Sequence, residues 1–328
     1  MKLGMMLPIG VGALGGGRPV RWTELREIAQ LAEAVGFDTL VVPDHLLFRN
    51  SPPGNVPAVV MPEGKTRGVW EAWSILGALA EATRRVNLGP LVACTSFRNP
   101  ALLAKMADTL DEVSGGRLVL GLGAGWHEPE YEAFGLPFDH RVSRFEEALQ
   151  IIVPLLREGR VDFQGRYYQV RSCELRPRGP RPTGPPILIG ALGPRMLRLA
   201  ARFADHYDAD FLLDPQPIVE RFARLEAACA EVGRDPKTIL RTAATRVALT
   251  TPGAATHQVG PARGGVAEFD MDGVRFAARQ GPPEEILAFL RTFEAVGVER
   301  LTCTIADPPG PRGVERFAPI VEALSRPA

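Results

Sequence analysis

A tryptophan, a histidine and a glutamate follow one another at residues 126–128, where a short apolar run ends. That run carries glycines at alternate positions, Gly121, Gly123 and Gly125. Because side chains alternate across a strand, such glycines leave one face bare, and that face admits a flat ligand or a close approach of another backbone. A buried strand that needs glycine for packing, followed by a solvated turn, explains the same residues.

Asp44 and His45 follow another apolar run and could together move a proton. A histidine titrates near neutral pH and can exchange a proton with a substrate. The adjacent carboxylate could hold the charge of the ring or orient it. The alternative is a structural histidine beside a helix-capping aspartate. The sequence leaves both interpretations open.

The small residues Gly190, Ala191, Leu192 and Gly193 join an apolar run to a predicted helix whose first residue is proline. Free backbone amides at such a turn can bind a phosphate, and the helix dipole favours negative charge there. Arg195 adds positive charge nearby. An ordinary turn between a strand and a helix, with proline at its favoured first position, is the alternative.

Other polar side chains favour structural roles. Cys94 could be a nucleophile, but a buried small hydrophobic residue is the simpler interpretation because the sequence places no base beside it. Glu128 and Glu130 could carry protons, although a charged run of this kind is usually a solvated loop. The sequence contains no HExxH, GxSxG or Walker pattern, so zinc proteolysis, serine hydrolysis and P-loop chemistry have no support.

The composition of the 328 residues is that of a globular protein with a substantial core. Lysine and arginine number 38, as do aspartate and glutamate, so the zero net charge does not favour binding to nucleic acid or to an anionic membrane. No run approaches the roughly 20 apolar residues of a membrane helix. The four cysteines are scattered without metal-ligand spacing, which favours reduced thiols and a cytoplasmic location.

Apolar runs and helical patterns alternate along the chain, which predicts an α/β protein. The predicted strands are Leu3–Leu7, Thr39–Val42, Val86–Ala93, Leu118–Leu122, Pro186–Ile189, His206–Leu212, Leu240–Leu249 and Leu301–Ile305. The predicted helices are 22–35, 70–82, 100–113, 141–156, 194–203, 217–232, 283–296 and 314–324. Eight strands that alternate with helices favour a single (β/α)8 TIM barrel over residues 1–328, with its active face at the strand ends.

Such a barrel takes about 250 residues, so the remainder forms insertions. We place them after the second, fourth and seventh strands, at about 48–68, 161–184 and 251–280. The second contains a predicted hairpin. The third is weakly patterned and is expected to bury little surface and to act as a lid. A two-domain doubly wound fold is disfavoured because the glycines at 10–17 lack GxGxxG spacing.

Three segments together resemble the luciferase-like flavin-dependent oxidoreductases. They are Phe97-Arg98-Asn99-Pro100-Ala101, the run from Asp111 to Arg117, and Gly123-Ala124-Gly125-Trp126. The resemblance spans Leu3 to Leu324. Asp44-His45, Gly125-Trp126 and the turn at 190–193 are similar to the branch that uses the deazaflavin coenzyme F-420.

This resemblance implies the same barrel, usually as a homodimer, with the cofactor ring over the strand ends and its phosphate at 190–193. His45 would stand beside the reactive ring as the catalytic residue. A non-prolyl cis peptide is implied between Leu91 and Val92. The implied cofactor-binding residues are Asp44, Leu91, Val92, Gly123, Gly125, Trp126, Gly190, Ala191, Leu192 and Gly193.

The expected function is therefore hydride transfer between a deazaflavin and a small organic substrate, in which the cofactor supplies the chemistry and the protein positions it. An FMN-dependent monooxygenase that uses reduced flavin and oxygen is the first alternative. A non-catalytic flavin-binding barrel is the second. The residues themselves do not name the substrate.

Overall fold

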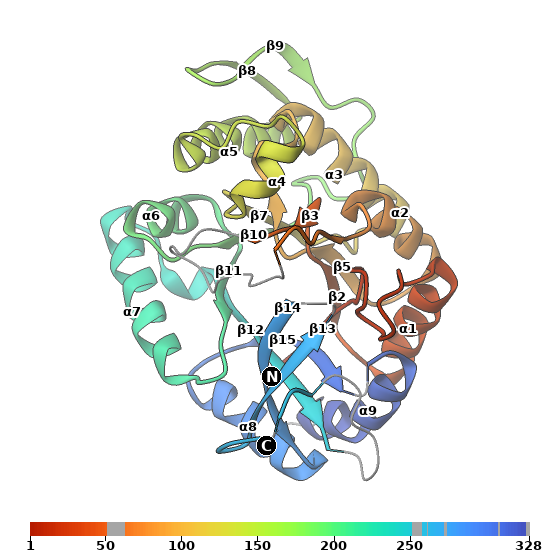
Figure 1. Ribbon diagram of the computed structural model, residues 1–328. Helices are drawn as coiled ribbons and strands as arrows, with labels where there is room; N and C mark the ends of the chain where they lie inside the picture. The colour runs from red at the N-terminus through yellow and green to blue at the C-terminus, as the bar shows by residue number, and fades with distance from the viewer. Residues whose placement is uncertain (51–62, 251–257, 261, 272–273, 308, 326–328) are drawn as a thin grey trace.

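Eight parallel strands form a ring in the computed structural model, which describes residues 1–50, 63–250, 258–260, 262–271, 274–307 and 309–325 (Figure 1). The strands of the ring are β1 (Lys2–Met6), β2 (Thr39–Val42), β5 (Asn87–Pro90) with β6 (Ala93–Cys94), β7 (Leu120–Gly123), β10 (Ile187–Gly190), β11 (His206–Phe211), β12 (Leu240–Leu249) and β15 (Arg300–Asp307). Leu88 closes the ring, since its amide donates to the carbonyl of Arg117 and its carbonyl accepts from the amide of Val119. The predicted TIM barrel is confirmed.

Helices surround the barrel, as Figure 1 shows. They are α1 (Trp22–Val35), α2 (Ala72–Ala82), α3 (Pro100–Ser114), α5 (Arg141–Glu158), α6 (Pro194–Phe203), α7 (Gln216–Glu231), α8 (Pro283–Ala295) and α9 (Pro311–Ser325). Their termini carry the expected signals. The side chain of Asn99 accepts hydrogen bonds from two amides of the first turn of α3, and Gly36 ends α1 with a φ of 104°. In the part of the chain that the structure describes, no helix is long and apolar enough to cross a membrane.

The third predicted strand is interrupted. β5 ends at Pro90, β6 begins at Ala93, and the peptide bond between Leu91 and Val92 is cis. The position of this bond is confirmed as the family resemblance implied it. Leu91 and Val92 pack in the interior of the barrel, where they join a cluster with Val41 and Ala244.

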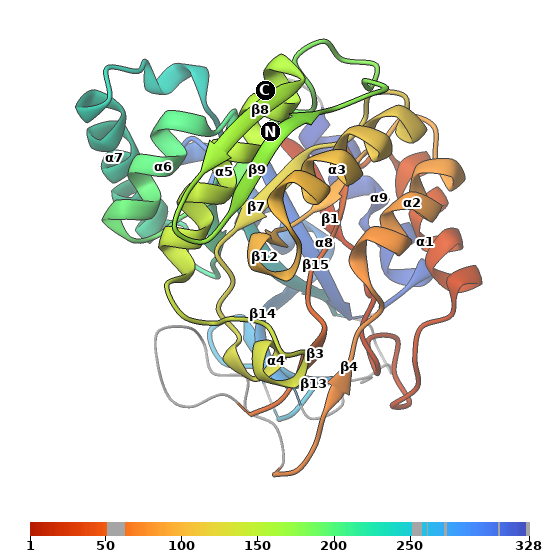
Figure 2. The same cartoon turned by 90° about the horizontal axis from the view of Figure 1, so that it is seen from above.

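The first two insertions contain short antiparallel pairs. β3 (Leu47–Phe48) pairs with β4 (Arg67–Gly68), and the intervening residues 51–62 lie outside the description. β8 (Arg160–Gln164) pairs with β9 (Gln169–Glu174), which confirms the predicted hairpin. Figure 2 shows β3, β4 and the short helix α4 (Glu128–Ala133) together at one end of the barrel.

The third insertion corrects the sequence prediction. β13 (Val266–Met271) and β14 (Val274–Gly281) form an antiparallel hairpin, and β14 also pairs with β12. Phe269 is fully buried and packs with Ala248 and Ala306 of the barrel. The expectation that this segment buries little surface is therefore wrong for the hairpin, because its buried alanines give only a weak apolar signal in the sequence. Residues 251–257, which belong to the predicted lid, lie outside the description.

Candidate active site at the barrel mouth

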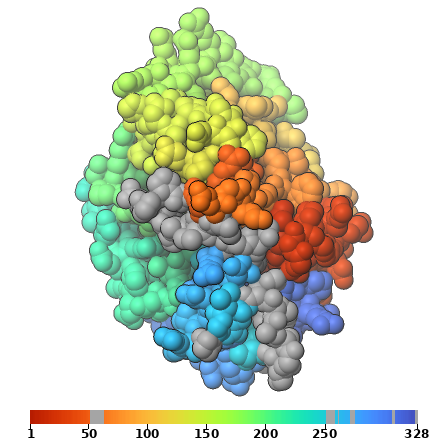
Figure 3. Space-filling model, in the orientation of Figure 1, coloured from red at the N-terminus to blue at the C-terminus, as the bar shows by residue number. Residues whose placement is uncertain are grey.

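Side chains that follow β2 and β7 meet at the carboxyl end of the barrel, where the β3–β4 strands, α4 and the β13–β14 hairpin also gather (Figures 2 and 3). The ring centroid of His45 lies 4.4 Å from that of Phe48 and 5.2 Å from that of Trp126. The ring of Trp126 in turn lies 5.1 Å from His127. The predicted proton carrier thus stands in an aromatic wall at the face where barrel enzymes place their active sites.

His45 is oriented by Glu130. Its Nδ1 lies 2.9 Å from Oε1 of this carboxylate, and the Leu46 amide donates to Oε2 at 2.8 Å. The side chains of His45 and Glu130 are 14% and 2% exposed. Since an ionised carboxylate only accepts hydrogen bonds, Nδ1 carries the proton. Nε2 has no hydrogen-bond partner among the described residues, so it is available for proton exchange with a ligand.

This pair corrects two interpretations of the sequence. Glu130 is a buried residue of α4 and does not lie in a solvated loop. Asp44 does not orient the ring of its neighbour, and it caps no helix. Its carboxylate instead receives Arg98 at 2.7 and 3.1 Å and the Cys94 amide at 3.0 Å. Burial raises the pKa of Asp44, and the guanidinium of Arg98 acts against that rise. Asp44 therefore ties the end of β2 to the segment after β6.

The structure does not favour Cys94 as a nucleophile. Its Sγ lies 2.7 Å from the hydroxyl of Tyr131, and burial raises the pKa of the thiol to about 12. The thiolate is the nucleophilic form of cysteine, so a thiol with this pKa is unreactive near neutral pH. The prediction of a buried small hydrophobic residue is confirmed.

The glycines of β7 make room for protein atoms. A Cβ on Gly121 would collide with the carbonyl oxygen of Pro90, and one on Gly123 would lie 2.5 Å from Cγ2 of Val92. Gly125 has a φ of 76°, and a Cβ there would collide with the Tyr131 hydroxyl. Protein atoms therefore lie close to the face that these glycines leave bare, which supports the interpretation that the strand needs glycine for packing.

The other histidine, His127, is buried and neutral. It is fully buried, and its Nε2 accepts a hydrogen bond from the amide of Arg49 at 3.2 Å. Burial lowers the pKa of His127 to about 4, so the ring is uncharged at neutral pH. Of the two histidines that the sequence places after β2 and β7, only His45 keeps a nitrogen available at the mouth.

The turn before α6 is open on one side. Gly193 precedes the helix with a φ of −80°, and a Cβ built on it would meet no atom within 4 Å. The hydroxyl of Tyr207 donates to the carbonyl of Ala191 at 2.9 Å, and this hydrogen bond holds the turn in place. Arg195 points to α5, where it contacts Glu146 at 2.5 Å and Ser143 at 3.0 Å. Arg195 is thus engaged with α5, and the open side of the turn presents its backbone.

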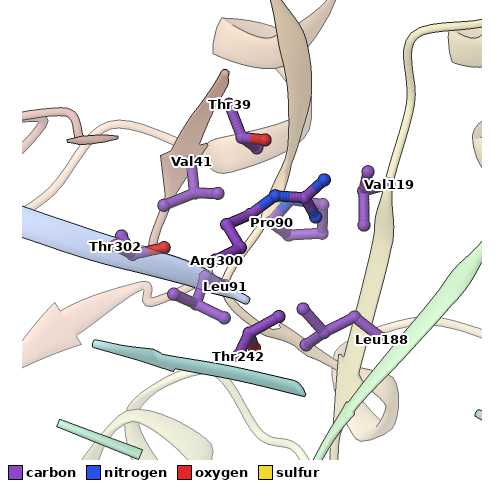
Figure 4. Close-up of a pocket in the computed structure, with 9 residues that line it drawn as sticks. All are labelled: Thr39, Val41, Pro90, Leu91, Val119, Leu188, Thr242, Arg300 and Thr302. Carbon is purple, nitrogen blue, oxygen red and sulfur yellow. The ribbon is translucent and has the colours of Figure 1, made fainter. Parts of the chain in front are cut away.

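In the described part of the chain, no group of three histidine, cysteine or acidic side chains could hold a metal ion. A cavity of about 10 Å³ lies inside the barrel between Thr39, Leu91 and Arg300 (Figure 4). That volume holds about one water molecule, so the cavity is too small for a cofactor or an organic substrate.

Residues 1–287 match the luciferase-like monooxygenase family. The chain belongs to this family. It is 34% identical over 244 residues to a phthiodiolone/phenolphthiodiolone dimycocerosates ketoreductase of Mycobacterium sp. (strain JLS), covering 71% of this chain and 63% of that protein. It is 34% identical over 57% of its length to the 5,10-methylenetetrahydromethanopterin reductase of Archaeoglobus fulgidus, 48% of which is matched. An F-420-dependent glucose-6-phosphate dehydrogenase of Microbacterium testaceum is 32% identical over 70% of this chain and 65% of that protein.

The matches thus span about half to two thirds of the lengths of these family relatives. Solved structures cover more of the chain. An F-420-dependent secondary alcohol dehydrogenase in complex with an F-420-acetone adduct superposes with a TM-score of 0.75 over 98% of both chains, at 20% identity. The EDTA monooxygenase of Chelativorans sp. BNC1 superposes with a TM-score of 0.72 at 16% identity, covering 99% of this chain and 94% of that one. These two likenesses show the same fold in a deazaflavin enzyme and in a monooxygenase.

Proposed function

We propose that the protein is an oxidoreductase that transfers a hydride between coenzyme F-420 and a small organic substrate. The relatives named above include an F-420-dependent dehydrogenase at 32% identity, which supports the choice of cofactor. The observation that carries the proposal is the pairing of His45 with Glu130, which leaves Nε2 available at the mouth.

The residues at the mouth fit a deazaflavin. The amides between Gly190 and Gly193 would hold its phosphate at the N-terminus of α6, where the helix dipole favours an anion. The open space beside Gly193 supports this role. The ring would lie against the Leu91–Val92 peptide and Val92, which Gly123 accommodates, with Trp126 as a wall. The same surface would also be shaped by Asp44, Gly125, Ala191 and Leu192.

His45 would manage the proton. The bound deazaflavin supplies the hydride acceptor or donor. When an alcohol is oxidised, its C–H bond loses a hydride and its hydroxyl loses a proton, and Nε2 of His45 would accept that proton. In the reverse direction Nε2 would return a proton to the carbonyl oxygen. Glu130 would hold the Nδ1 proton throughout and stabilise the charged imidazolium.

We also propose a homodimer in the cytoplasm. The family resemblance supports the dimer, and the scattered unpaired cysteines support a reducing compartment. Multi-angle light scattering of the purified protein tests the dimer, for which we expect twice the chain mass of 35.6 kDa. A mass of one chain at micromolar concentration would contradict it.

The products formed under air distinguish this function from that of an FMN-dependent monooxygenase. That function is the second candidate because monooxygenases are among the relatives and the similar solved structures. Reduced coenzyme F-420 and reduced FMN are each mixed with the protein under air, with and without a panel of carbonyl compounds. We expect F-420 to be reoxidised only when a carbonyl substrate is present, without oxygen uptake. Formation of an oxygenated product with reduced FMN, which His45→Gln abolishes and the exposed control Glu128→Gln leaves intact, would identify a monooxygenase instead.

A further inference from the structure

Arg246 extends from β12 into the barrel mouth. Residues two apart on a strand point to the same side, and Thr242 lines the interior cavity while Ala244 packs in the interior cluster. Arg246 therefore occupies the next interior level, between Ala244 and the carboxyl end of the barrel. Ala244 shares its cluster with Val92, against which the cofactor ring is proposed to lie.

Two aromatic rings hold the guanidinium of Arg246. Its central carbon lies 4.6 Å from the ring centre of Phe211, at the end of β11, and 5.8 Å from that of Phe276 on β14. Contacts of a cation with ring faces fix the plane of the group and leave its N–H donors at the edge. The β13–β14 hairpin thus places this arginine over the mouth.

The positive charge of Arg246 is not neutralised by the described residues. No carboxylate among them lies within ion-pair distance of it, and Asp210, which acts on it at longer range, contacts Arg221 at 3.6 Å. Burial lowers the pKa of Arg246. Burying a cation without a partner costs free energy, and an anionic ligand would offset that cost.

We propose that Arg246 binds an oxyanion of the substrate, so that the protein acts on compounds that carry a carboxylate or a phosphate. Guanidinium groups recognise both anions through two parallel hydrogen bonds. In the ring of strands, β1 and β15 separate β12 from β2, after which His45 follows. A substrate anchored at Arg246 would therefore extend across the mouth toward His45. This inference rests on the proposed function for its substrate, but not for the anion site itself.

The test uses inorganic phosphate and benzoate as probes of the protein without cofactor. Each probe is titrated by calorimetry at constant ionic strength into Gly193→Val protein, in which the turn before α6 is blocked. Arg246→Met is then added to this background, and Arg291→Met, an exposed arginine of α8, is the matched control. Arg246→Met removes a charged hydrogen-bonding partner. We expect it to raise the dissociation constant of one or both probes by about 10-fold or more.

The control should leave both dissociation constants unchanged, and the probe that weakens more identifies the anion. Unchanged binding of both probes in Arg246→Met would overturn the proposal, as would a loss that Arg291→Met reproduces. Coenzyme F-420 affinity, measured on Arg246→Met alone, should stay within about 3-fold of wild type because the phosphate turn is intact. If Arg246→Met weakens the probes and F-420 does not bind wild type at all, the anion site stands and the proposed function fails.

Discussion

Nδ1 of His45 lies 2.9 Å from Oε1 of Glu130, although the two residues are 85 positions apart in the sequence. The carboxylate fixes which nitrogen carries the proton, and it leaves Nε2 without a hydrogen-bond partner among the described residues. The proposed proton transfer therefore depends on a residue of α4 as much as on the histidine itself.

Glu130→Gln tests this dependence. The amide of glutamine can donate to Nδ1, which would move the ring proton to Nε2, and it cannot balance the imidazolium charge. We expect turnover to fall by about 10²–10⁴-fold, the range for loss of general acid–base catalysis. Cofactor affinity should be unchanged. The matched control is Glu128→Gln on the exposed side of the same helix, and steady-state kinetics of both variants give the comparison. Equal turnover in the two variants would remove Glu130 from the mechanism.

Gly193→Val tests the phosphate turn. The fold has room for the side chain, since a Cβ there meets no atom within 4 Å, but the added methyl groups would occupy the space before α6. We expect the melting temperature to stay near wild type and coenzyme F-420 affinity to fall by about 10-fold or more, about 1.4 kcal/mol or more of binding free energy. Gly77→Ala, a helical glycine with open space around it, is the control. Undiminished affinity would place the phosphate elsewhere.

Gly121→Ala tests the packing of β7 against β5. The added methyl group would collide with the carbonyl oxygen of Pro90, so one of the strands must shift. We expect the free energy of unfolding in urea to fall by about 1–3 kcal/mol, as in overpacked cores. The same change at Gly77 should raise it by up to about 1 kcal/mol, because alanine favours a helix. Equal stability of the Gly121 variant and wild type would mean that the strands lie farther apart.

His206→Gln tests how pH acts on the barrel. Burial, with a further contribution from Arg300, lowers the pKa of His206 from 6.5 to about 4. The unfolded chain therefore binds more protons between these values, and stability is lost as pH falls from about 6.5 to about 4. That loss is up to about 3 kcal/mol for this residue.

Urea unfolding at pH 7 and pH 4 should show a smaller difference for His206→Gln than for wild type. His127 still contributes in the same direction, since burial lowers its pKa also to about 4. His140→Gln, at a side chain that is 50% exposed, is the matched control. The same pH dependence in His206→Gln and wild type would show that this histidine is not held neutral.

Local signals accounted for most of the fold. The bounds of α1 follow from its apolar spacing and from Gly36, and β12 has the same bounds as the predicted strand, Leu240–Leu249. The β13–β14 hairpin was not predicted as strands, because its partner lies in β12 and its buried positions include two alanines. An element is predictable from the sequence when it carries its own periodicity, and it is not when tertiary pairing makes the strand.

The site was predictable only in part. His45 and the turn at 190–193 lie where strand ends placed them, because the barrel order fixes those ends at one face. The sequence pattern predicts a solvated loop at Glu130, since nothing local indicates that α4 folds over the mouth and brings its carboxylate to His45. In the sequence, Arg98 stands out only as part of the family motif. Its pairing with Asp44 was not predictable because it joins segments 54 positions apart.

The most direct test of the proposed function is a calorimetric titration of the cofactor-free protein with coenzyme F-420 and, separately, with FMN. We predict that F-420 binds with a dissociation constant at least about 10-fold lower than that of FMN, a difference of about 1.4 kcal/mol. Gly193→Val should weaken F-420 binding in the same experiment. FMN binding as tight as or tighter than that of F-420 would contradict the assignment to deazaflavin-dependent hydride transfer.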